Sequence, residues 1–248
     1  VNLNNRPDYY NYTTQVATLT FRGLSDNIVT VNSTTRFWRF RVNKGIDQSY
    51  VLSVVGTEEN CDPFKGRDPM IHSDQAGERA TISIYAGTVR LGENLNVAKL
   101  STNEGYDIGV DEDQEKAQLW IDGATVEEPG YIAVYGNLKI SSGVLNTNRI
   151  VIRYNGSIEI NGGEINVSQI RPSIYTDATP RGSYVQTGGV VNMSGGVNNN
   201  NYPRFCWPHA STAFVMTDGE LNVFGSTPNG DAVHGGILIS SNNVEVTG

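Results

Sequence analysis

The chain has few of the residues on which several classes of function depend. Of its 248 residues, three are histidine and two are cysteine, and 26 Asp and Glu outnumber 18 Lys and Arg, which gives a net charge of −8. Binding of nucleic acid rests on clustered Lys and Arg, and so does a polybasic membrane contact. We therefore expect neither partner. The acidic balance is compatible with an extracellular, solvent-exposed surface, or simply with solubility.

Long apolar runs are also missing. No stretch of about 18 apolar residues occurs, which predicts that no segment is inserted in a membrane. No charged-apolar-small signal peptide opens the chain. The sequence begins at Val1, and its last strand-like stretch, 243–246, looks incomplete. We therefore expect a fragment of a longer protein.

Helical periodicity is the third absence, and a repeat stands in its place. Strand-like alternation is frequent, whereas no segment shows a convincing 3.6-residue period. A glycine followed three residues later by asparagine recurs, and a degenerate earlier copy begins at Gly123. The repeat glycines are Gly123, Gly143, Gly163, Gly189 and Gly219, with spacings of 20, 20, 26 and 30 residues. Self-similarity at such a period is typical of a solenoid.

One repeat divides into three strand-like segments, 149–153, 157–160 and 163–167, separated by corners rich in Gly and Asn. This pattern predicts an all-β fold, a right-handed parallel β-helix with about 20–30 residues and three short strands per coil. The right hand follows from the general preference of crossover connections. We expect one continuous solenoid over 1–248, less regular with insertions in 1–116 and clearly repeating in 117–248.

The alternation within repeats predicts an interior and an outer ladder. Apolar side chains expected inside are Trp120, Ile140, Ile158, Ile160, Ile165, Phe214 and Met216. The asparagines that end the repeat motif are Asn146, Asn166, Asn192 and Asn222. If equivalent asparagines stack at about 4.8 Å, their amides can hydrogen-bond along the stack as a ladder at the corner. We interpret this ladder as structural.

The two cysteines, Cys61 and Cys206, could form one disulfide in an oxidising compartment. In a solenoid they would lie several coils apart, beyond the roughly 7 Å Cα separation that a disulfide tolerates. We therefore predict two free, buried thiols. The three histidines are far apart and show no zinc-ligand spacing.

Two segments could bind something. The acidic run around Asp107, Asp111 and Asp113 could hold calcium, which prefers six to eight oxygen ligands, although the run matches no EF-hand and also reads as a solvated loop. Tyr202, Phe205 and Trp207 lie in the insertion 197–211. They suit a contact surface for carbohydrate or protein, or a cap that closes a widened corner.

Catalysis is an alternative that the residues support weakly. Glycoside hydrolysis needs two carboxylates about 5–9.5 Å apart, and Glu159 and Glu164 are candidates by proximity. The segment 230–235 has a faint likeness to the His-Gly element of polygalacturonase-type enzymes. The paired-aspartate and Arg-x-Lys elements of that family are missing. We predict no catalytic residue, no metal site and no cofactor.

The segments 41–48, 117–123 and 182–192 resemble the long, repetitive secreted proteins of Bacteroidota, such as gliding-motility adhesins and other cargo of the type IX secretion system. The resemblance implies export across the outer membrane and display at the cell surface. Partners would then be the secretion translocon, other surface proteins or surface carbohydrate. We hypothesise a structural or adhesive segment serving gliding or attachment. A carbohydrate-active β-helix enzyme, or cargo captured with its secretion machinery, are the alternatives.

Overall fold

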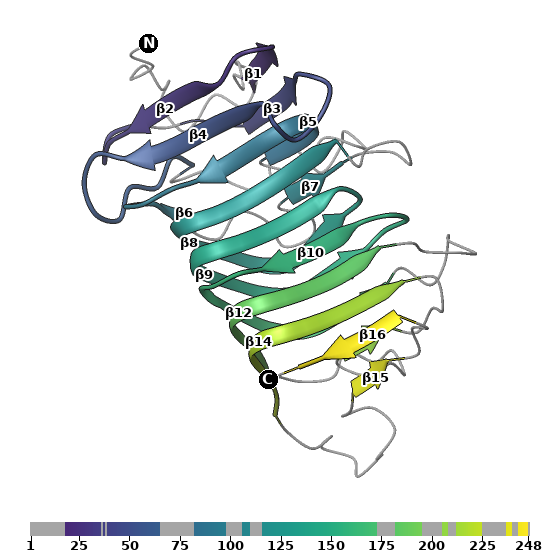
Figure 1. Cartoon of the computed structure of the whole chain (residues 1–248). Helices are drawn as coiled ribbons and strands as arrows, with labels where there is room; N and C mark the ends of the chain where they lie inside the picture. The colour runs from purple at the N-terminus through teal and green to yellow at the C-terminus, as the bar shows by residue number, and fades with distance from the viewer. Residues whose placement is uncertain are drawn as a thin grey trace.

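The computed structural model describes residues 18–35, 37, 39–64, 82–97, 106–109, 116–172, 182–194, 205–207, 212–224, 237–239 and 243–247. These residues form 16 strands of one sheet, and Figure 1 shows the strands lying one above another along the molecule. The strands are β1 (Thr18–Gly23), β2 (Asn27–Val31), β3 (Arg39–Lys44), β4 (Val51–Gly56), β5 (Ile82–Leu91), β6 (Asn96–Val97), β7 (Tyr106–Ile108), β8 (Ala117–Val134), β9 (Asn137–Ile152), β10 (Ser157–Ile160), β11 (Glu164–Pro172), β12 (Ser183–Met193), β13 (Phe205–Trp207), β14 (Ala213–Val223), β15 (Ile237–Ile239) and β16 (Asn243–Val246). The expected all-β class is confirmed. No helix in the described part is long and apolar enough to cross a membrane.

Every strand pairing in the described ranges is parallel, and the pairings form three stacks. The first stack joins β2, β4, β5, β8, β9, β10, β12, β14 and β16. The second joins β6 with later parts of β8, β9, β11, β12 and β14. The third joins β1, β3, β5, β7, β8, β9, β11, β13 and β15.

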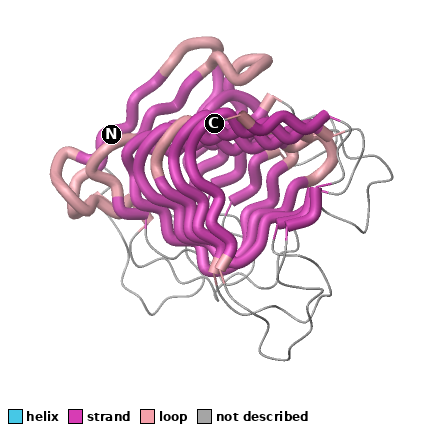
Figure 2. The backbone as a smooth tube through the Cα atoms, turned by 60° about the horizontal axis from the view of Figure 1, so that its bottom comes forward, coloured by secondary structure: helices cyan, strands magenta, loops and turns pink. Residues whose placement is uncertain are grey.

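Two strands are longer than the expected short segments. β8 and β9 have 18 and 16 residues, and each passes through all three stacks in turn. Their mutual pairing is interrupted by register shifts next to Asp122 and between Glu128 and Tyr131, where the chain changes direction. Figure 2 shows the successive strands following one another along bent paths. β8 and β9 therefore continue through the corners of these two repeats, whereas β10 and β11 are separate strands as expected.

The register between strands equals the repeat period found in the sequence. Ile158 lies beside Leu138, 20 positions earlier, and beside Tyr184, 26 positions later. Because a parallel pairing keeps this offset along the strand, residues with the same place in the repeat lie on top of one another. Because successive side chains of a strand point to opposite faces, every second side chain of each strand points inward.

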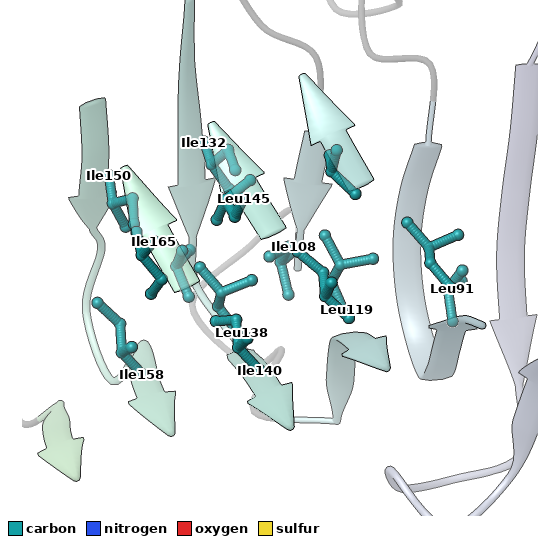
Figure 3. Close-up of a cluster of buried hydrophobic side chains, with 14 of the residues drawn as sticks. Leu91, Ile108, Leu119, Ile132, Leu138, Ile140, Leu145, Ile150, Ile158 and Ile165 are labelled. Carbon is teal, nitrogen blue, oxygen red and sulfur yellow. The ribbon is translucent and has the colours of Figure 1, made fainter. Parts of the chain in front are cut away.

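The inward side chains form one apolar core. Ile140, Ile158, Ile160 and Ile165 are fully buried, as predicted, and Figure 3 shows side chains of successive strands meeting in this interior. Phe214 is also buried, and Met216 is partly buried against the core. These interior assignments are confirmed.

Trp120 is an exception, because the structure places it on the outside. Its neighbours Leu119 and Ile121 are both fully buried, so alternation turns Trp120 outward. There it pairs in register with Lys139, and its Nε1 donates a hydrogen bond of 2.8 Å to Ser141 Oγ. The interior assignment of Trp120 was wrong because it considered apolarity and ignored the alternation of β8.

The aromatic residues of the insertion are also placed differently from the contact-surface hypothesis. Phe205 is 0% exposed and Trp207 2% exposed, both pack with Tyr184, and Phe205 also packs with Phe214. The ring centroids of Tyr184 and Phe214 lie 5.0 Å apart in a stacked arrangement. Phe205 and Trp207 are therefore core residues of the third stack. Tyr202 lies outside the described residues.

Both cysteines are buried and have free thiols, as predicted. The backbone of Cys61 pairs with that of Leu95 in an isolated β-bridge next to the second stack, and Cys206 lies in β13 of the third stack. Burial raises the pKa of the Cys206 thiol, and the nearby positive charge of Arg171 acts in the opposite direction.

Tyr184 and Gln186 form a polar pair within the core. The Tyr184 hydroxyl donates a hydrogen bond of 2.7 Å to Gln186 Oε1, and both side chains are fully buried. Gln186 Nε2 donates to the carbonyl oxygens of Gly189 and Glu220, at 3.3 and 3.1 Å. The amide thereby satisfies its polar groups within the apolar interior, and it ties the first stack to the second.

The repeat glycines occupy the corner between the first and second stacks. All five have positive φ, from 70° at Gly189 to 107° at Gly123. A Cβ at Gly163 would lie 2.8 Å from the Gly143 carbonyl oxygen of the preceding repeat. Both the backbone conformation and the close approach of neighbouring repeats therefore require glycine there.

We expect Gly163→Ala to destabilise the protein more than Gly23→Ala. Gly23 also has positive φ, but a Cβ there meets no atom within 4 Å. Gly23→Ala should lower the free energy of unfolding by about 1–2 kcal/mol through the left-handed conformation alone. Gly163→Ala adds the clash with Gly143. Urea-induced unfolding measures both, and equal losses would contradict the stacking of these corners.

Tyr184→Phe tests the buried polar pair. The variant keeps the ring but leaves Gln186 Oε1 without its donor, which should cost about 1–3 kcal/mol of unfolding free energy. Combining it with Gln186→Leu should cost less than the sum of the two single changes, since the unpaired group is then gone. Strict additivity in a thermal or urea unfolding series would mean that the two side chains do not interact.

Candidate functional site

A ladder of four asparagines runs along the outer side of the second stack. Three of them donate from Nδ2 to the asparagine Oδ1 of the preceding repeat: Asn166 to Asn146 at 2.8 Å, Asn192 to Asn166 at 3.1 Å, and Asn222 to Asn192 at 3.2 Å. The predicted ladder is confirmed. Its position differs from the prediction, because the asparagines lie within strands, pointing outward between buried neighbours such as Ile165 and Val167, and not at a corner.

The ladder ends on a carboxylate that the repeat pattern did not reveal. Asn146 Nδ2 donates to Glu127 Oε1 at 2.5 Å, so all four amides donate in the same direction toward this charge. In the other repeats the ladder residue lies three positions after the glycine, which would be Val126 after Gly123. The register shift between Asp122 and Thr125 instead places Glu127 beside Asn146. The chain of amide dipoles and its charged acceptor strengthen one another.

A groove lies beside the ladder. Its volume is about 480 Å³, and its walls are Glu127, Glu128, Pro129, Asn146, Thr147, Asn166, Val167, Ser168 and Ser194. Glu128 is buried, and its Oε1 accepts a hydrogen bond of 2.8 Å from the backbone N–H of Gly130. This fixes Glu128 in the corner, whereas Glu127 lies at the start of the ladder.

The outer side of the first stack carries a different column. Arg90, Trp120, Lys139 and Glu159 lie in register on β5, β8, β9 and β10. The Arg90 guanidinium carbon lies 5.1 Å and Lys139 Nζ 5.6 Å from the Trp120 ring centroid, so one cation contacts the ring from each neighbouring strand. Arg90 also pairs with Asp122 at 2.5 Å. Partly exposed contacts of this kind contribute modestly to stability.

The two carboxylates considered for catalysis lie on different stacks. Glu159 accepts hydrogen bonds from Lys139 at 2.8 Å and from Asn161 at 3.0 Å. Burial acts to raise the pKa of Glu159, but these hydrogen bonds and the charge of Lys139 lower it below its usual range. Glu164, in β11 of the second stack, accepts from Asn192 at 3.1 Å. Each carboxylate is thus engaged by its own neighbours.

The calcium hypothesis falls largely on residues that are not described. Asp107 lies in β7, and Asp111 and Asp113 lie outside the described ranges. Within the ranges given above, no group of three or more His, Cys, Asp or Glu side chains is arranged to hold a metal ion. The segment 230–235, weighed for its His-Gly element, also lies outside them.

Asn166→Ala tests the ladder. It removes the donor to Asn146 and the acceptor of Asn192, so we expect a loss of about 1–3 kcal/mol in unfolding free energy. The matched control is Asn161→Ala, which removes one exposed hydrogen bond to Glu159 and should cost no more than about 0.5 kcal/mol. Denaturant unfolding would contradict a stabilising ladder if the two variants were equally stable.

Comparison of the chain with protein-family models, with curated proteins and with solved structures gave no match.

Proposed function

We propose that the chain is a right-handed parallel β-helix that forms a structural and adhesive segment of a large secreted bacterial surface protein. The observation that carries the proposal is that every pairing among the described strands, from β1 to β16, is parallel and joins one repeat to the next. β8 and β9 each visit the first, second and third stacks in that order before the next repeat begins. This order supports a chain that winds around one axis.

Such an arrangement is suited to spacing and display. Each repeat contacts mainly the repeats before and after it, so length can be added without changing the core. The outward columns are polar or charged, as the ladder and the Arg90–Glu159 column illustrate. The sequence resemblance to gliding adhesins and other type IX cargo supports placing this segment at the cell surface, with gliding or attachment as its role.

Surface display can be tested in the organism that encodes the chain. An antibody raised against residues 116–172 should label intact cells, and protease added to those cells should remove the label. Disabling the type IX translocon should leave the chain inside the cell. Recovery of the protein only from the cytoplasm of normal cells would contradict the proposal.

A further inference from the structure

We propose that the groove beside the asparagine ladder binds a neutral saccharide. The groove consists of the nine residues given above, and its polar lining includes Asn146, Asn166, Ser168 and Ser194. The inference goes beyond surface display, because it assigns a ligand class to one place on the molecule.

The hydrogen bonds within the ladder determine which amide hydrogens remain without a partner. Asn192 uses its Nδ2 toward both Asn166 and Glu164, and Asn222 uses its Nδ2 toward both Asn192 and Glu220. Asn146 and Asn166 each make one such bond among the described residues, to Glu127 and to Asn146. A primary amide carries two hydrogens. The two asparagines that line the groove therefore each have one amide hydrogen that these hydrogen bonds do not use.

The oxygen atoms of these amides are already engaged. Asn146 Oδ1 accepts from Asn166, and Asn166 Oδ1 accepts from Asn192. The groove selects a ligand that brings hydrogen-bond acceptors.

The charge of the groove excludes an anionic ligand. Glu127 and the buried Glu128 both line the groove, and the chain has a net charge of −8. A phosphate, sulfate or uronate would meet repulsion there. The acceptors that the two amides require must therefore come from an uncharged molecule.

A saccharide hydroxyl fits both requirements, because it accepts one hydrogen bond and donates another. It can accept from Asn146 or Asn166 and donate to Glu127, while the Ser168 and Ser194 hydroxyls serve either role. An extended peptide is the rival ligand. Peptides usually add to an exposed sheet edge through backbone pairing, whereas the strands under this groove already pair on both sides. Side-chain recognition of hydroxyls is thus favoured.

The test uses the purified chain and a glycan array that holds neutral, uronic and sulfated oligosaccharides, together with a set of extended peptides. We expect binding to at least one neutral oligosaccharide. In a titration followed by NMR, the side-chain amide signals of Asn146 and Asn166 should shift more than those of Asn192 and Asn222. Binding only to anionic glycans or to peptides, or binding with no shift at Asn146 and Asn166, would overturn the proposal.

Two substitutions localise the site. Glu127→Gln keeps the acceptor for Asn146 but removes the charge, so affinity for the neutral glycan should fall about tenfold, as expected for a lost hydrogen bond to a charged group. Ser168→Trp fills the groove and should abolish binding, with the exposed Thr187→Trp outside the groove as its control. Should Ser168→Trp fail to fold, Glu127→Gln decides, and unchanged affinity in that variant overturns the proposal.

The saccharide proposal deepens the proposed function but is tested apart from it. Binding is measured on purified protein, whereas display is measured on intact cells. A chain that is displayed and binds no glycan contradicts only the groove assignment. A chain that binds glycan and stays in the cytoplasm contradicts only the surface role.

Discussion

Backbone hydrogen bonding between parallel strands one repeat apart is the constraint on which the rest of the structure depends. It fixes which residue of one repeat lies beside which residue of the next, as in the pairing of Ile165 with Leu145 and Val191. Since no single repeat can bury its own apolar side, the stability of each one comes from its neighbours. The in-register stacking of like residues, Tyr184 on Phe214 or Asn166 on Asn146, is a direct consequence.

The same constraint governs the corners. A repeat can approach its neighbour closely only if no Cβ intervenes, and the corner also needs positive φ. Gly143, Gly163, Gly189 and Gly219 meet both conditions, and the added Cβ would in each case reach backbone atoms of the preceding repeat. The recurring glycine is therefore a requirement of stacking and not only a turn signal.

Stacking also explains why polar groups occur where they do. On the outside, asparagines repeat and form a directional chain of hydrogen bonds that ends on Glu127. Inside, the apolar position held by Ile121, Ile140 and Ile160 is held by Gln186 in β12. The Gln186 amide is hydrogen-bonded to the Tyr184 hydroxyl and to two backbone carbonyl groups. Asn192 and Asn222 each donate two hydrogen bonds from Nδ2, whereas Asn146 and Asn166, beside the groove, each donate one.

The sequence by itself determined the strand class, the repeat period, the corner glycines, the ladder asparagines and most of the interior, because all of these recur at a fixed spacing. Tertiary structure decided the features that break the period. The register shift after Asp122 put Glu127 at the end of the ladder, and the alternation of β8 turned Trp120 outward. Phe205 and Trp207 belong to a strand that only its pairing with Ile170 and β15 identifies as core. The groove likewise depends on side chains of β8, β9 and β11 and on Ser194, just after β12, which become neighbours only through parallel pairing.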